Sequence, residues 1–128
     1  MAALLRIDKG EEKAITPTEL ATAPLCILKV TAPWCGPCKR IHPEFVGHCM
    51  NNERITGCVL DVELAQSEAG EALQFYEQLN IEAFPTFIAL VQGQELKRFK
   101  GASAMGLEAL FRDTTQAASA PTTVSSES

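Results

Sequence analysis

Short apolar runs alternate along the chain with segments of helical period, and this alternation predicts the elements of the fold. The runs that predict strands are residues 3–7, 25–31, 54–62, 84–91 and 94–100. Residues 25–31 are apolar on both faces apart from Lys29, which is typical of a strand at the centre of a sheet covered on both sides. Gln92-Gly93, between the last two runs, predicts a hairpin.

Start signals and helical spacing predict helices between these runs. Thr16-Pro17-Thr18-Glu19 has the spacing of a capping box with proline at the first helical position. Helical character then runs from Cys35 to about Asn51 and from Leu64 to Asn80. Ser103 is placed to cap a last helix.

This order of elements predicts an α/β fold of three layers, α/β/α. A central mixed sheet of about five strands with an antiparallel edge lies between flanking helices. Residues 1–113 are expected to form this single domain. Residues 114–128 consist mainly of Thr, Ser, Ala and Pro without a hydrophobic period, so we expect a disordered tail there.

Composition narrows the classes of partner and compartment. Apolar residues make up 46% and charged residues 21%, an ordinary globular mixture, and the net charge of −5 offers no basic patch for nucleic acid. No run approaches the roughly 18 apolar residues that would predict a membrane span. The apolar start of the chain is too short for a secretory signal, and the acidic residues that follow it argue against a transit peptide. The five cysteines are an odd number and so do not form an even disulfide framework. We therefore expect a reducing intracellular compartment, cytoplasmic, with the mitochondrial matrix as the alternative.

The chemistry of the chain is concentrated in Trp34-Cys35-Gly36-Pro37-Cys38. A predicted strand before it and a predicted helix after it put Cys35 at a helix N-terminus. Unpaired N–H groups there favour a thiolate, so the pattern indicates dithiol–disulfide exchange. A zinc site is the competing interpretation, but it requires four ligands. The remaining cysteines, Cys26, Cys49 and Cys58, form no second closely spaced pair and are expected to be buried apolar residues.

With Phe84-Pro85-Thr86 and Gly101-Ala102 following in order, the chain resembles the thioredoxins across residues 3–112. The resemblance implies a protein-disulfide reductase in which Cys35 is the attacking thiolate and Cys38 the resolving thiol. It implies that Pro85 is a cis-proline beside the disulfide and that the backbone of Phe84 pairs with an extended substrate peptide. The substrate-binding residues carried over by position are Trp34, Gly36, Pro37, Phe84, Pro85, Gly101 and Ala102.

The resemblance also implies partners and cofactors. We expect disulfide-containing protein substrates, an upstream dithiol or flavoenzyme reductase, and a monomer. No metal or bound organic cofactor is expected, because the electrons pass through the dithiol and nothing in the chain resembles a nucleotide-binding loop.

Two features depart from the family pattern. Lys29 stands where thioredoxins usually have a buried aspartate that relays the proton of the resolving thiol, and Val59 aligns with the usual basic partner. The segment from Glu63 to Pro85 is longer than usual by roughly two helical turns.

Lys29 is therefore a candidate catalytic residue with three alternative roles. If it is buried and charged, it stabilises nearby thiolates and makes the disulfide more oxidising. If it is buried and neutral, it accepts the proton of Cys38. It can instead reach the surface, or pair with Asp61 or Glu63, without a catalytic role.

Two other functions stay open beside a reductase. Lys29 favours a more oxidising disulfide oxidase or isomerase, whereas the long segment and the missing aspartate favour a redox-gated binding scaffold. His42 and His48 fall beyond the start of the second helix, and we expect surface or packing roles for them.

Overall fold

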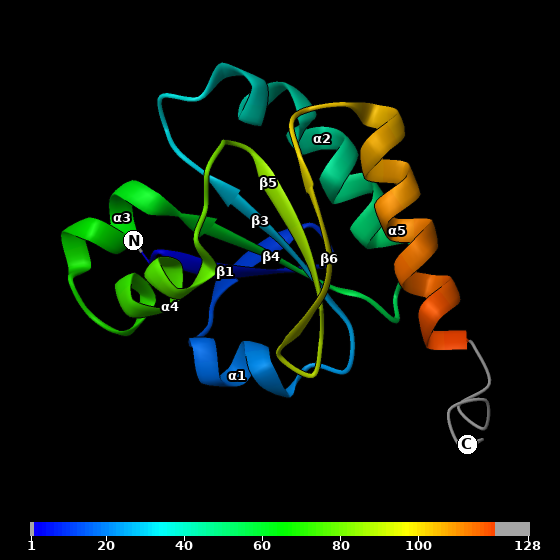
Figure 1. The fold of residues 1–128 in the computed structure, drawn as a ribbon, viewed down its shortest axis with the longest axis horizontal. Coiled ribbons are helices and arrows are strands. Elements are labelled where there is room, and N and C mark those ends of the chain that lie inside the picture. The colour runs from blue at the N-terminus through cyan, green and yellow to red at the C-terminus, as the bar shows by residue number, and fades with distance from the viewer. Residues whose placement is uncertain (1, 120–128) are drawn as a thin grey trace.

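A computed structural model describes residues 2–119 and contains one mixed sheet of six strands in the order β2-β1-β4-β3-β5-β6 (Figure 1). β3 and β4 are parallel, and every other neighbouring pair is antiparallel. The strands are β1 (Leu4–Asp8), β2 (Glu11–Ala14), β3 (Cys26–Thr31), β4 (Thr56–Asp61), β5 (Thr86–Val91) and β6 (Gln94–Lys100). The helices are α1 (Pro17–Thr22), α2 (Gly36–Asn51), α3 (Val62–Glu68), α4 (Glu71–Leu79) and α5 (Ala104–Ser119).

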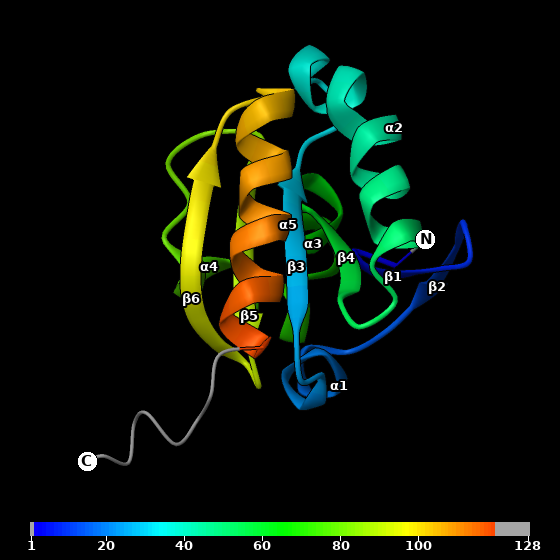
Figure 2. The same cartoon turned by 90° about the vertical axis from the view of Figure 1, so that its right-hand side faces the viewer.

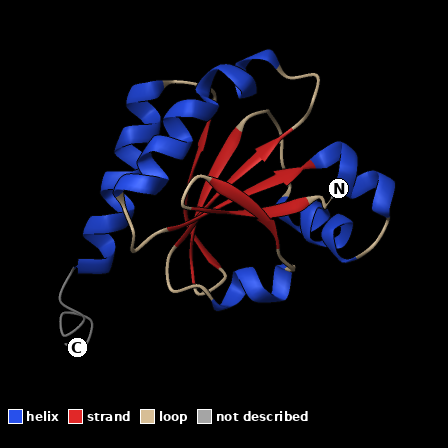
Figure 3. Ribbon diagram, turned by 180° about the vertical axis from the view of Figure 1, so that it is seen from behind, coloured by secondary structure: helices blue, strands red, loops and turns tan. Residues whose placement is uncertain are grey.

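Helices cover both faces of the sheet, so the predicted three layers are confirmed. α2 and α5 lie together on one face (Figure 2), where Phe45 and Leu110 join a core with sheet residues such as Phe87. α1, α3 and α4 lie on the other face, as the view from behind also shows (Figure 3). The site described below lies where β3 ends and α2 begins.

The central strand β3 divides its side chains between the two cores. Cys26, Leu28 and Val30 belong to the core under α1, α3 and α4, and Ile27 belongs to the core under α2 and α5. Because successive side chains of a strand alternate between faces, Lys29 points to the same side as Ile27, toward α2. Lys29 stands opposite Val59 of β4, the residue that the family resemblance places at the position of the usual basic partner.

Local signals at the element ends are confirmed. In the capping box of α1 the Glu19 amide donates to Thr16 Oγ1 at 3.0 Å, and the Thr16 amide donates to Glu19 Oε1 at 2.8 Å. The β5–β6 hairpin turns at Gln92 and Gly93, both with positive φ. Ser103 caps α5, because its Oγ accepts from the Gly106 amide at 3.1 Å.

β2 is an edge strand that the apolar pattern did not predict. All four of its residues are exposed and three are charged, so it carries no apolar alternation. It forms because Lys9 and Gly10 both adopt positive φ and turn the chain back, which pairs Asp8 with Glu11. Charged residues on an edge strand also discourage pairing with other chains.

The helical stretch predicted from Leu64 to Asn80 is two helices. Asp61 is the N-cap of α3, and its Oδ1 accepts a hydrogen bond from the Leu64 amide at 3.0 Å. Ala69, in the left-handed conformation, is the C-cap of α3, and Gly70 is the N-cap of α4. This pair of helices accounts for the long segment between Glu63 and Pro85.

The disordered tail predicted from Thr114 is wrong for residues 114–119, which continue α5. Thr114 is fully buried, and its hydroxyl donates to the Leu110 carbonyl at 2.7 Å. Thr115 does the same to Phe111 at 2.9 Å. These hydroxyls are satisfied within the helix, so polar residues extend it where the sequence showed no apolar period. The rest of the predicted tail, residues 120–128, lies outside the described residues.

The core under α2 and α5 gives a prediction about stability. Phe45 is fully buried, and its ring centroid lies 5.5 Å from that of Phe87 and 6.0 Å from that of Phe111. We expect Phe45→Ala to lower the free energy of unfolding by about 3–5 kcal/mol in chemical denaturation, because it leaves a cavity between these rings. Met105→Ala, at an 81% exposed position, is the control and should change it by less than about 0.5 kcal/mol. Equal losses in the two variants would contradict this account of the core.

Candidate active site

The two cysteines of the motif lie at the start of α2 and form a disulfide, with their Cα atoms 5.3 Å apart. Cys35 is the N-cap residue, and its Sγ accepts a hydrogen bond from the Cys38 amide at 3.2 Å. Pro37 occupies one of the first two helical positions, where its missing N–H costs nothing. The free N–H groups and the dipole of the helix thus face Cys35 Sγ, which is the arrangement that favours a thiolate.

An apolar rim surrounds the disulfide. Trp34 is 66% exposed, and its ring packs edge-on against Phe84 with centroids 5.4 Å apart. Phe84 also packs against the small buried cluster that contains both cysteines. The Phe84–Pro85 peptide bond is cis, and the Gly101 amide donates to the Pro85 carbonyl at 2.9 Å.

These contacts bring four of the predicted substrate-binding residues together: Trp34, Phe84, Pro85 and Gly101. Gly36 and Pro37 are exposed at the first turn of α2. Ala102, next to Gly101, packs against the core under α2 and α5.

Lys29 is buried beside Cys38, with only 3% of its surface exposed. Its Nζ donates to the Cys38 carbonyl at 2.9 Å and lies 2.8 Å from Nδ1 of His42. Burial lowers the pKa of Lys29 to about 8, and the negative charge of Glu12 opposes that shift. The alternative in which Lys29 reaches the surface or pairs with Asp61 or Glu63 is therefore wrong: within residues 2–119, neither carboxylate forms an ion pair with it.

His42 is the site residue that the sequence analysis missed. Its side chain is 33% exposed, and its Nε2 lies 3.8 Å from a carboxylate oxygen of Glu12 on β2. Burial lowers the pKa of His42, the charge of Lys29 lowers it further, and Glu12 opposes both. The available signal was spacing, because His42 follows Cys38 by four residues and so lies on the same face of α2. His48 has the expected packing role, stacked on Phe111 with centroids 5.0 Å apart.

A cavity of about 290 Å³ joins these polar groups to the surface. Among its lining residues are Lys29, Thr31, Cys38, Lys39, His42 and Asp61. Its volume is enough for several water molecules, each of which takes about 30 Å³ in the liquid. Cys38 and Lys29 therefore share one solvent-accessible space although both are buried.

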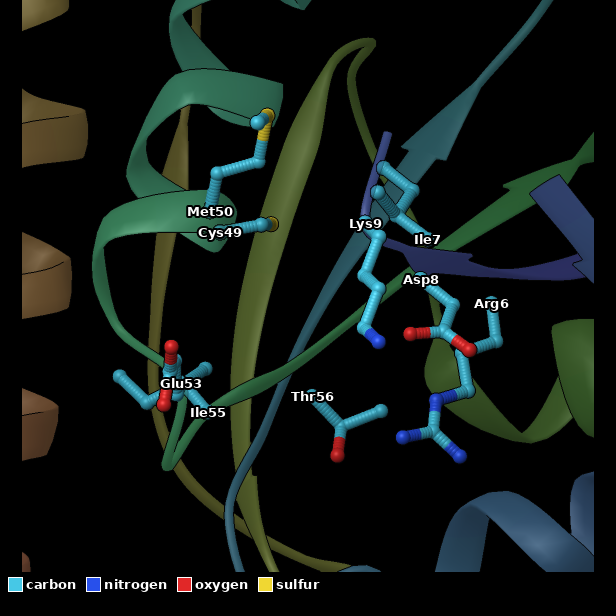
Figure 4. Close-up of a pocket in the computed structure, with 9 residues that line it drawn as sticks. All are labelled: Arg6, Ile7, Asp8, Lys9, Cys49, Met50, Glu53, Ile55 and Thr56. Carbon is cyan, nitrogen blue, oxygen red and sulfur yellow. The ribbon is translucent and has the colours of Figure 1, made fainter. Parts of the chain in front are cut away.

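A larger hollow of about 420 Å³ lies at the other end of α2, away from the disulfide (Figure 4). Arg6, Asp8, Lys9 and Glu53 are charged residues of its lining, and Cys49 lies at its wall. Burial raises the pKa of Cys49 to about 12, so this thiol stays protonated at neutral pH and is a poor nucleophile.

The other two cysteines are also buried thiols. Cys26 and Cys58 lie on the neighbouring strands β3 and β4, and both are free. The hydrogen bond with Cys58 and then burial raise the pKa of Cys26 well above its usual value. All three remaining cysteines are therefore buried in the folded protein, as expected from the sequence.

The described residues contain neither a candidate metal site nor a helix that could span a membrane. Within residues 2–119, no three His, Cys, Asp or Glu side chains gather in a way that would hold a metal ion, so Cys35 and Cys38 lack the further ligands of a structural zinc site. None of the helices there combines the length and the apolar character needed to cross a bilayer.

Comparison with known proteins gives the same assignment as the geometry. The thioredoxin family model matches residues 13–113. The Dictyostelium discoideum protein named "Putative thioredoxin-5" is 37% identical over 97 residues, covering 73% of this chain and 85% of the relative. Rattus norvegicus thioredoxin is 32% identical over 89 residues, covering 70% and 78%. A solved structure of Plasmodium falciparum thioredoxin superposes with a TM-score of 0.67 at 27% identity, covering 76% of this chain and 88% of that one.

The family match covers most of the chain, and a Cys35–Cys38 disulfide occupies the active-site position at the start of α2. The chain therefore belongs to the thioredoxin family, and it is an oxidoreductase that reduces disulfides through this pair.

Proposed function

We propose that the protein reduces disulfides in protein substrates, with Cys35 as the attacking thiolate and Cys38 as the resolving thiol. The observation that carries this assignment of roles is the position of Cys35 Sγ at the N-terminus of α2, where it accepts a hydrogen bond from the Cys38 amide. The rim of Trp34 and Phe84 offers apolar contact for a peptide on either side of the target disulfide.

The electrons balance in two steps. The Cys35 thiolate attacks one sulfur of the target, forming a mixed disulfide while the other target sulfur leaves with the electron pair and takes a proton from solvent. Cys38 then loses its proton, and its thiolate attacks Cys35 Sγ, which releases the second target sulfur and leaves the Cys35–Cys38 disulfide. An upstream dithiol or flavoenzyme reductase returns two electrons and two protons.

Lys29 is proposed as the group that controls the proton of Cys38. It lies behind Cys38 at the same cavity, and a pKa of about 8 leaves it mostly charged at neutral pH yet able to exchange a proton. The proposed setting is a reducing intracellular compartment, cytoplasmic or mitochondrial, in which the monomer works with Cys26, Cys49 and Cys58 as free thiols.

A second candidate function, a more oxidising oxidase or isomerase, is favoured by the same buried Lys29. A positive charge close to the cysteines stabilises thiolates relative to the disulfide and so raises the reduction potential.

Trapping of the mixed disulfide tests the assigned roles. Cys38→Ser should accumulate a covalent complex with a disulfide-containing protein such as insulin, because the resolving step is lost. Cys35→Ser should accumulate none, because the attacking sulfur is gone. The readout is a shifted band on a non-reducing gel that disappears with added dithiol. Equal trapping by the two variants would reject the roles, and binding without any covalent complex would favour the scaffold.

The reduction potential separates reductase from oxidant. A value of about −270 mV is expected for a reductase, whereas a value of about −200 mV would favour the oxidase or isomerase. We expect both Lys29→Met and Lys29→Asp to make the pair more reducing, by about 30 mV for a tenfold change in the exchange equilibrium. Lys97→Met removes the same charge from an exposed site and is the control. A potential that does not move in either Lys29 variant would remove Lys29 from the proposal.

Stability measured against pH tests the protonation of buried Lys29 without any substrate. Its pKa is about 8 in the folded protein and about 10.4 in an unfolded chain, so the unfolded state binds more protons between these values. The free energy of unfolding should therefore rise with pH across this window, by up to about 3 kcal/mol relative to Lys29→Met. Chemical denaturation of the oxidised protein is the measurement, since its active-site cysteines do not titrate. Parallel curves for the two proteins would mean that Lys29 is not desolvated.

A further inference from the structure

Lys29 is only 3% exposed, and its polar contacts continue from Cys38 toward the surface. Its second polar contact is Nδ1 of His42 at 2.8 Å, and the other ring nitrogen, Nε2, faces Glu12 at 3.8 Å. The three side chains come from β3, α2 and β2 and increase in exposure from the interior outward, with 47% of the Glu12 side chain exposed.

We propose that His42 is the proton-transfer partner of Lys29, so that Lys29, His42 and Glu12 carry the Cys38 proton between the buried disulfide and the surface. This inference rests on the proposed reductase cycle and names its proton path. His42 acts through Lys29 and does not touch the reacting sulfurs, so it is a positioning residue.

The charge of Lys29 decides which atom donates in its contact with His42. A charged Lys29 has three protons, of which one is donated to the Cys38 carbonyl and one to His42 Nδ1. A neutral imidazole that accepts at Nδ1 carries its own proton on Nε2, facing Glu12. Two ring nitrogens with separate partners are the arrangement that lets a histidine pass a proton from one side to the other.

The steps balance over a complete cycle. Lys29 gives a proton to His42 Nδ1 while Nε2 releases one to Glu12 or to water. The neutral Lys29 amine then takes the Cys38 proton through the shared cavity, and the Cys38 thiolate attacks Cys35. In re-reduction a proton moves inward by the same path, and this restores the Nε2–H form of His42 without a ring flip.

The surrounding charges agree with a proton held between Lys29 and His42. Glu12 raises the pKa of both groups, whereas the charge of Lys29 lowers that of His42. The other titratable groups at the cavity are Cys38 and Lys39 of α2 and Asp61 at the end of β4, and Asp61 is engaged as the cap of α3.

The test measures the two half-reactions separately in the intact protein. Trp34 is the only tryptophan and adjoins Cys35, so stopped-flow fluorescence can follow both steps with a peptide disulfide. Attack by Cys35 is measured in a Cys38→Ser background, and resolution is measured with Cys38 present. We expect His42→Ala and His42→Gln to slow resolution about tenfold at pH 7 while attack stays within about twofold.

Two further arms separate proton transfer from simple packing. Added imidazole should restore resolution in His42→Ala in proportion to its concentration, because the site opens to solvent through the cavity. Glu12→Gln should shift the pH profile of resolution to lower pH, since Glu12 raises the pKa of both partners. His48→Ala and Glu11→Gln are the matched controls from the same helix and the same strand, and neither should alter resolution or its profile.

An unchanged rate and pH profile in both His42 variants would overturn the proposal. Equal slowing of attack and resolution, or slowing that imidazole does not rescue, would overturn it as well, because a packing role gives that result. Failure of the underlying reductase function looks different: the Cys38→Ser protein would then form no mixed disulfide with the peptide at all.

Discussion

Burial of β3 on both faces is the constraint on which the rest of the structure depends. Five of its six residues are buried, between α2 and α5 on one side and α1, α3 and α4 on the other. A polar side chain buried on this strand must form hydrogen bonds inside the protein, because an unpaired buried polar group destabilises the folded state. Lys29 is such a residue, and its partners are a backbone carbonyl and an imidazole of the neighbouring helix. The start of α2 is fixed by the same strand, since the chain leaves β3 at Thr31 and enters the helix within five residues.

The parts of the site that the sequence predicted are those set by local chemistry. Cys35 and Cys38 are three residues apart, so a helix start brings both sulfurs to one N-terminus whatever the rest of the fold does. The apolar run also placed Lys29 within a strand covered on both sides, but it left open whether the side chain is buried or reaches the surface. Its burial and its partners depend on which residue of another element comes into contact with it, and here that residue is His42.

The missed parts depend on contacts between distant segments. β2 has no apolar pattern and forms through a turn at Lys9 and Gly10 together with pairing to β1. Glu12 therefore could not be placed beside His42 from sequence. α5 runs past its predicted end because Thr114 satisfies its hydroxyl within the helix, a detail that a hydrophobic period does not reveal.

Packing of the three interior thiols also affects the redox chemistry of the protein. In the oxidised protein the Cys35–Cys38 disulfide and the free thiols of Cys26, Cys49 and Cys58 belong to the same chain. A thiolate from any of the three could exchange with that disulfide. Burial prevents this exchange, because it encloses all three sulfurs in the core and raises the pKa of Cys26 and of Cys49. The folded core thus separates the active-site disulfide from the other thiols of the same chain. When the protein unfolds, these thiols are exposed and can exchange with the disulfide, so a more stable fold also lowers the rate of disulfide scrambling.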